Sequence, residues 1–388
     1  MKVIDKQRRK LLQYSVMGLG AFMGNVWLPA PVKAASLSLS SLGKLQPADQ
    51  NDLRLPVGFT SRIVANSGQS LFGYNWHAAP DGGATFATSD GGWIYVSNSE
   101  LDDQTGGAGA LRFSPLGEIV DAYSILDRTN RNCAGGRTPW KTWLSCEEID
   151  KGQVWECDPF GQKTAQARSA LGLFRHEAVA VDNKKKQFYL TEDETDGCLY
   201  RYTAQSFDTL GNPNFNSGIL EVAEVINGQV GAVRWHPLPD PLAVSLPTRK
   251  QIPNCTPFNG GEGIWYYQNI VYFSTKGDNR VWAYNVQDSS LAIIYDAALF
   301  LKPVLTGVDN ITGNAVGELL VAEDKGNMQI VALTLDKIVP VVKVANQSNS
   351  EITGLAFSPD GSRLYFSSQR GKTGNSGDGI TFEVTGPF

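Results

Sequence analysis

The chain has 388 residues, of which 42% are hydrophobic and 19% charged, so it is long enough for one large folded domain or two smaller ones. Its 34 basic and 39 acidic residues give a net charge of -5 without a long basic block, which argues against a nucleic-acid partner. Forty glycines and an aromatic content of 10% indicate an all-β protein of many short strands joined by tight turns.

The amino terminus has the pattern of a processing segment. Arg8 and Arg9 precede an apolar stretch, and small residues near Ala34 offer a cleavage point. We interpret residues 1–35 as a twin-arginine-type signal peptide, with an ordinary secretory signal as the alternative. The apolar stretch is too short and glycine-rich for a stable membrane span, so we expect a periplasmic or secreted protein. Residues 36–55 are interpreted as a linker and residues 56–388 as a single β-propeller domain.

One unit recurs along residues 56–388. It is an aromatic or β-branched strand that ends in polar or acidic residues, and its copies begin at residues 94, 142, 188, 271, 319 and 364. Most copies start about 45 residues apart, which is the length of a propeller blade. We therefore predict a six-bladed β-propeller, a fold without long exposed sheet edges. The one longer interval contains residues 219–257, interpreted as an insertion over one face, with a seventh blade as the alternative.

Acidic residues recur at matching points of these units. In a propeller, the start of each innermost strand and the end of the next strand meet at the same mouth of the channel. Crowded carboxylates raise one another's pKa unless cations neutralise them, so the pattern predicts a metal site. Oxygen ligands favour Ca²⁺, Mg²⁺ or Mn²⁺, whereas one thiolate among them favours iron. The alternative is a mouth that is polar only because its loops face water.

The stretch around Cys133 is the most distinctive part of the chain. Cys133 precedes the Gly135-Gly136 bend, and a hairpin would bring its thiol toward the carboxylates of Glu147 and Glu148. The five cysteines, at positions 133, 146, 157, 198 and 255, form neither a zinc pattern nor an even disulfide framework. At least one thiol is therefore left free, and we assign it to Cys133.

These motifs resemble those of the PhoX alkaline phosphatase family. The similarity runs from about Asn98 to Gln369 and is carried by the following segments: 132–140, 146–148, 176–179, 189–193, 197–201, 261–263, 309–311 and 351–354. The resemblance implies an exported six-bladed propeller that carries iron and calcium in its channel. It implies a phosphoric monoester hydrolase whose substrate is a small phosphate ester.

The resemblance also implies which residues bind metal. The candidate ligands are Glu100, Cys133, Glu147, Glu148, Glu177, Glu262, Asp309 and Asp324. One departure concerns the arginine that grips phosphate in the family, because its position two residues before Glu262 holds Gly260 here. Possible substrate contacts are Asn132, Arg137, Lys276 and Arg370, and the sequence does not choose among them.

The sequence therefore predicts an exported, metal-dependent phosphatase with an iron and calcium site, which we expect to be a monomer. Two other functions stay open. A calcium-binding propeller without catalytic activity would fit the change at Gly260, and a lactonase or phosphodiesterase on the same propeller would also fit the acidic channel mouth.

Overall fold

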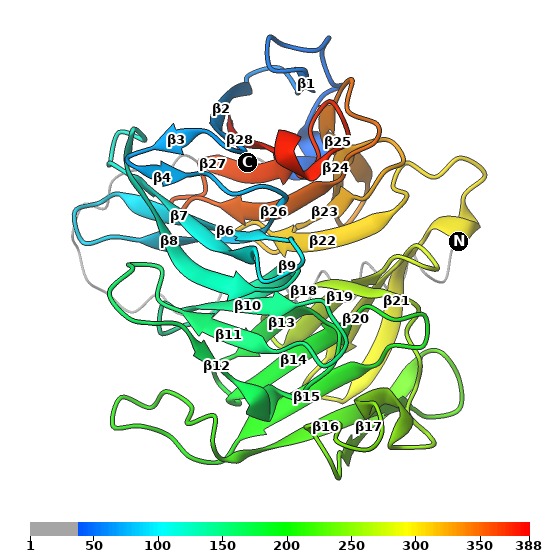
Figure 1. Cartoon of the computed structure of the whole chain (residues 1–388). Coiled ribbons are helices and arrows are strands. Elements are labelled where there is room, and N and C mark those ends of the chain that lie inside the picture. Colours follow the sequence, from blue (N-terminus) through cyan, green and yellow to red (C-terminus); the bar gives the residue numbers. More distant parts are fainter. Residues whose placement is uncertain (1–37) are drawn as a thin grey trace, which may run out of the picture.

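The computed structural model describes residues 38–388, and nearly all of its regular structure is β-strand (Figure 1). The predicted signal peptide, residues 1–35, lies outside the described residues. The helical segments within the described part are short 3-10 turns: η2 (Leu39–Ser41), η3 (Ser169–Leu171), η4 (Thr248–Lys250), η5 (Ala297–Leu299) and η6 (Ser376–Asp378). No helix in residues 38–388 is long and apolar enough to cross a membrane. The all-β prediction is confirmed.

Four of the sheets are antiparallel meanders of consecutive strands, and two of these gain one strand from the start of the described chain at the outer edge. The first contains β5 (Pro80–Ala87), β6 (Trp93–Ser99), β7 (Gly106–Phe113) and β8 (Ile119–Thr129). The second contains β9 (Asn132–Arg137), β10 (Trp143–Glu147), β11 (Val154–Cys157) and β12 (Gln166–Ala167). The third contains β22 (Val308–Gly313), β23 (Leu319–Glu323), β24 (Gln329–Leu333), β25 (Ile338–Val344) and β1 (Leu53–Arg54). The fourth contains β26 (Ile352–Phe357), β27 (Arg363–Ser368), β28 (Ile380–Thr385) and β2 (Thr60–Asn66). A separate hairpin pairs β3 (Ser70–Leu71) with β4 (Tyr74–Asn75).

A nine-stranded sheet replaces two of the separate sheets expected from the sequence. It contains β13 (His176–Asp182), β14 (Gln187–Glu192), β15 (Leu199–Ala204), β16 (Gly218–Val225), β17 (Gly231–Pro237), β18 (Gly261–Tyr267), β19 (Ile270–Thr275), β20 (Arg280–Asn285) and β21 (Ser290–Asp296). The two meanders fuse because β17 pairs with both β16 and β21. Residues 219–225 therefore belong to strand β16, not to an insertion over one face. The arrangement is propeller-like, but the sheets do not divide into six separate ones.

The first strand of each meander lies at the centre of the molecule. These innermost strands, β5, β9, β13, β18, β22 and β26, pack against one another in chain order, and β26 packs against β5 to close the ring. The two ends of the described chain also meet, because β2 pairs with β28 over residues 60–66 and 380–385, where blue and red strands adjoin in Figure 1. All six innermost strands therefore begin around one channel.

Neighbouring innermost strands approach so closely that some positions tolerate no side chain. A Cβ atom added at Gly82 would lie 2.5 Å from the Cα of Ala134, and one at Gly136 would lie 1.8 Å from the carbonyl oxygen of Val179. Real Cβ contacts are not this short, so glycine at these positions is a requirement of the ring. This explains why the Gly135-Gly136 pair lies within a strand, although the sequence suggested a bend.

We predict that Gly136→Ala lowers the free energy of unfolding by about 3 kcal/mol, because the added methyl group forces β9 away from β13. Urea titration followed by tryptophan fluorescence measures this change. Gly377→Ala is the matched control, since a Cβ atom there meets nothing within 4 Å. Equal unfolding midpoints for the two variants would contradict the close packing described above.

Candidate metal centre

A β-bulge near the start of five of the six innermost strands turns one side chain toward the channel. The pairing register slips directly after Pro80, Asn132, His176, Gly261 and Val308, so that an extra residue opposes the neighbouring strand there. Such bulges bend a strand and re-aim its side chains. The residues that follow these five positions are all potential metal ligands: Asp81, Cys133, Glu177, Glu262 and Asp309.

A second series comes from the strand that follows each innermost strand. The residue directly after that strand is Glu100, Glu148, Asp193, Lys276, Asp324 or Gln369. Because the two strands of each pair are antiparallel, these residues lie at the same mouth as the bulge residues. Five of the six join the bulge residues in lining a pocket of about 110 Å³, together with Arg131, Glu351 and Arg370.

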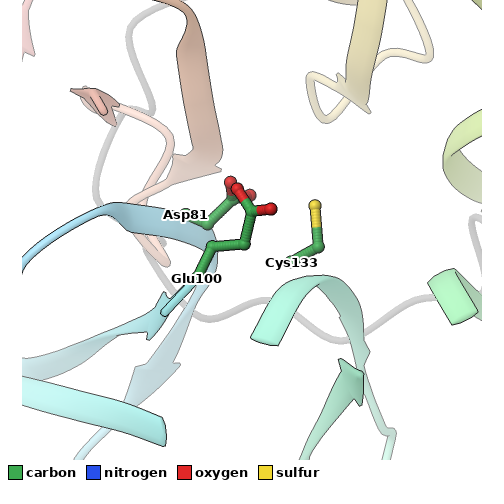
Figure 2. A group of neighbouring side chains, drawn as sticks. All are labelled: Asp81, Glu100 and Cys133. Atoms are coloured by element: carbon green, nitrogen blue, oxygen red, sulfur yellow. The ribbon is translucent and has the colours of Figure 1, made fainter. Parts of the chain in front are cut away.

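The potential ligand atoms in this pocket form four overlapping groups. Within each group the atoms lie within 4.8 Å of one another, and the groups are Asp81–Glu100–Cys133, Cys133–Glu148–Glu177, Glu177–Glu262–Asp309 and Asp309–Asp324–Glu351. Figure 2 shows the first group, in which the Asp81 and Glu100 carboxylates lie together and the Cys133 sulfur points into the same space. Each group shares a residue with the next, so the cluster is continuous across the channel mouth.

Charge in this pocket is strongly unbalanced, because nine carboxyl groups and three basic groups line it. Burial and the nearby carboxylate of Glu262 raise the pKa of Glu177 well above its usual value. Burial raises the pKa of Asp193 to about 6, despite the opposing effect of Lys276. Burial and the acids around Cys133, beginning with Asp81, raise the pKa of its thiol, which donates to Glu177 Oε1 at 3.3 Å.

Three basic side chains offset part of this charge. The Nζ atom of Lys276 lies 2.9 Å from Glu262, 3.2 Å from Asp309 and 3.5 Å from Asp324. Burial alone would lower the pKa of Lys276, but these carboxylates raise it above its usual value. Arg131 pairs with both Glu100 and Glu148, and Arg370 pairs with Glu351.

The side chains that line the pocket are suited to binding metal ions. One thiol and eight carboxylates converge from different strands, a donor set that binds hard cations at the oxygen atoms and iron at the sulfur. Among the described residues, Oδ1 of Asp324 is buried without a hydrogen-bond partner. Bound cations would satisfy this atom and neutralise the excess carboxylates.

The structure does not bring Glu147 into the pocket, although its neighbour Glu148 lies there. Successive residues of a strand point to opposite sides. The Glu147 carboxylate turns outward and accepts hydrogen bonds from the backbone N–H groups of Asn130 and Gln153, at 3.0 and 3.1 Å. Glu192 and Glu323, which end the equivalent strands β14 and β23, accept backbone hydrogen bonds in the same way. The candidate ligand Glu147 is therefore corrected to a residue that ties two loops together.

Two predicted substrate contacts also lie elsewhere. Asn132 is fully buried, and its amide group contacts the hydroxyls of Thr129 and Ser145. Arg137 stands four residues after Cys133 on the same strand, roughly 13 Å away at 3.3 Å per residue. It lines a separate pocket of about 520 Å³ near the other ends of the innermost strands. Lys276 and Arg370, by contrast, do reach the candidate metal centre.

Sequence reasoning left four residues of the pocket out of the candidate set: Asp81, Arg131, Asp193 and Glu351. Asp81 belongs to the segment Pro80-Asp81-Gly82-Gly83, which has the composition of a turn but forms the start of β5. Its position one residue after the start of an innermost strand, as for Cys133 and Glu177, is the signal that identifies it.

Comparison with known proteins places the chain in a family. The family model described as alkaline phosphatase PhoX matches residues 78–154 and 150–293, which is more than half of the chain. The chain belongs to the alkaline phosphatase PhoX family. The predicted resemblance is thereby confirmed, and the PhoX match includes Cys133 and Glu262. It ends before Asp309, Asp324 and Glu351. No curated protein sequence matches the chain.

Solved structures share the fold. A structure of Pseudomonas fluorescens PhoX in complex with vanadate, a transition state analogue, superposes with a TM-score of 0.72 at 17% identity, covering 89% of this chain and 98% of that one. A Bacteroides thetaiotaomicron protein of unknown function superposes with a TM-score of 0.52 at 8% identity, covering 84% of this chain and 76% of that one. At such identities these likenesses show the fold alone, which supports the propeller-like assignment.

We predict different effects for substitutions of the two neighbouring residues Glu147 and Glu148. Glu148→Gln removes a charged carboxylate from the pocket and should lower metal content, whereas Glu147→Gln should keep the metal and lower the free energy of unfolding by about 1–3 kcal/mol. Elemental analysis and thermal unfolding measure the two effects. Loss of metal from both variants to the same extent would show that Glu147 acts as a ligand.

We also predict that the metal-free chain loses stability as the pH rises. The pKa values of Asp193 (about 6), Glu177 and Glu262 are raised in the folded chain, so its carboxyls stay protonated at pH values where those of the unfolded chain have ionised. The free energy of unfolding should therefore fall as the pH rises from about 4 through 6 and beyond. Urea unfolding at pH 5 to 8 after chelation tests this, and added calcium should remove the loss. A metal-free chain that gains stability across this range would contradict the charge imbalance.

Proposed function

We propose that this chain hydrolyses small phosphate monoesters at the candidate metal centre. Family membership supports phosphatase activity, and the carboxylates and thiol that converge at the channel mouth supply a suitable site. The observation that carries the proposal is the convergence of Cys133, Glu148, Glu177 and Glu262 within the segment that matches the family. Their side chains come from separate strands yet line one pocket.

Iron and calcium are the cofactors that the donor set fits best. The two groups that contain Cys133 would hold iron through sulfur and oxygen, and the two groups that contain Asp309 would hold calcium through oxygen alone. Bound there, the cations would neutralise phosphate charge and lower the pKa of a coordinated water molecule. Cys133 would then be a metal ligand and not a nucleophile.

Lys276 is the side chain we propose for holding the phosphate group. The family arginine is replaced by Gly260, whose carbonyl oxygen accepts a hydrogen bond from the Lys276 backbone N–H at 2.8 Å. Lys276 therefore adjoins the vacated position and directs its ammonium group into the pocket. Phosphate oxygens accept charge-assisted hydrogen bonds from such a group. Arg370 lines the same pocket and would add a second positive charge beside Glu351.

We further propose how the chain is organised around this site. Residues 1–35 are a twin-arginine-type signal peptide, residues 36–55 are a linker whose strand β1 pairs with β25, and residues 56–388 form the enzyme in the periplasm or outside the cell, as a monomer. Within the nine-stranded sheet, β13–β16 and β18–β21 count as two blades bridged by β17, which gives six blades in all. The ring of innermost strands supports this division.

The proposal is tested on full-length chain purified without chelator. Elemental analysis and hydrolysis of a generic phosphomonoester with added calcium should show bound iron and calcium together with turnover. Cys133→Ser should lose iron and activity, while Cys157→Ser, a buried thiol outside the pocket, should keep both. Metal without turnover on phosphomonoesters would indicate a calcium-binding propeller, or a hydrolase that acts on lactones or phosphodiesters. Absence of metal would contradict the site.

We predict that Lys276→Met raises KM for the phosphomonoester roughly 10- to 100-fold, because a charge-assisted hydrogen bond to phosphate is lost. The inhibition constant of inorganic phosphate should rise by a similar factor. Lys163→Met, at an exposed surface position, is the control. An unchanged KM and inhibition constant in Lys276→Met would exclude this lysine as the phosphate-binding group.

A further inference from the structure

Two cysteine thiols lie in contact outside the metal centre. The Sγ atom of Cys198 donates to the Sγ atom of Cys255 at 3.5 Å, although the residues are 57 positions apart in the chain. Cys198 is buried, whereas Cys255 is half-buried, and neither lines the acidic pocket. No role in metal or phosphate binding accounts for this pair.

The backbone around the two thiols is held in place by other contacts. Phe258 donates its N–H to the carbonyl oxygen of Gly197 at 2.7 Å, so the segment after Cys255 pairs with the segment before Cys198. Arg249, whose carbonyl oxygen accepts from the Cys255 thiol, also forms ion pairs with Glu192 and Asp196 at 3.0 Å. The two sulfur atoms are therefore kept adjacent by the fold, independently of any covalent bond.

We propose that Cys198 and Cys255 form a disulfide bond when the folded chain meets a disulfide-containing oxidant. The Cys255 thiolate, the more accessible of the two, attacks one sulfur of the oxidant and releases a thiolate. The Cys198 thiol then loses its proton and attacks the Cys255 sulfur, releasing the second thiolate of the oxidant. The chain loses two protons and two electrons, and the oxidant is reduced to two thiols. The sulfur atoms need to approach by about 1.5 Å to reach bonding distance.

Geometry also supports an effect of this bond on the neighbouring pocket. The loop that carries Cys255 continues through Gly260 to Glu262, and the turn that carries Cys198 follows Asp193. Gly260 donates its N–H to the Glu194 carbonyl oxygen at 2.8 Å. A disulfide between these segments would fasten one wall of the candidate metal centre by a covalent bond.

The test uses the full chain purified without chelator, first reduced and then incubated with oxidised glutathione. Alkylation in denaturant followed by intact mass measurement should find three modified thiols, because two of the five cysteines are joined. Peptide mapping without reductant should recover a peptide that contains Cys198 linked to Cys255. Five modified thiols, a pairing that involves other cysteines, or a stable glutathione adduct in place of the internal bond would overturn the proposal.

Stability provides a second readout that does not depend on enzymatic activity. The oxidised chain should melt about 5 °C above the reduced chain, since the cross-link restricts the unfolded state. Cys198→Ser and Cys255→Ser should lack this difference, and Cys157→Ser should retain it. If a variant fails to fold, the wild-type chain with and without reductant still decides, because equal melting temperatures in the two states would count against a bond formed in the folded protein.

Discussion

Repulsion among buried carboxylates at the channel mouth is the constraint on which the rest of this structure depends. Nine acids line the pocket, and three basic groups cannot balance them. Lys276 directly follows β19, and at the equivalent position after most of the corresponding strands the chain has an acid. At this one position a positive side chain therefore stands in place of a carboxylate, and it pairs with Glu262. Cations at the proposed metal centre would neutralise the remaining excess charge, so the stability of the fold and the proposed catalysis would have a common requirement.

The alternation of side chains along a strand divides the acids into two functions. Where a strand ends in two consecutive acids, the second faces the channel and the first faces the loops. Glu148 and Asp324 face the pocket, while Glu147 and Glu323 accept backbone hydrogen bonds that fix the loops beside it. The acids that face the loops thus hold in place the segments that carry the acids of the pocket. A substitution in the pocket removes a carboxylate directly, whereas a substitution of a loop-facing acid loosens the segment that carries one.

Much of this arrangement could be predicted from the sequence, because it depends on local pattern. The repeat of about 45 residues led to the propeller-like fold, and the resemblance to the PhoX family led to Glu100, Glu177 and Glu262, which line the pocket. The pattern could not show that Asp81 begins a strand, since its glycine-rich surroundings also suit a turn. It could not reveal the bridging role of β17 or the contact between Cys198 and Cys255, which arise from pairings between distant segments.

Closure of the ring by β2 and β28 has a consequence for the order of assembly. The pocket takes Asp81 from the first innermost strand and Glu351 from the approach to the last, so it is incomplete until both ends of the domain are present. During synthesis, the ribosome therefore releases nearly the whole chain before the ligand set exists. Pairings between such distant segments form slowly. Metal binding at the proposed centre would accordingly follow synthesis of nearly the whole domain, and any check on metal content would act on the folded domain.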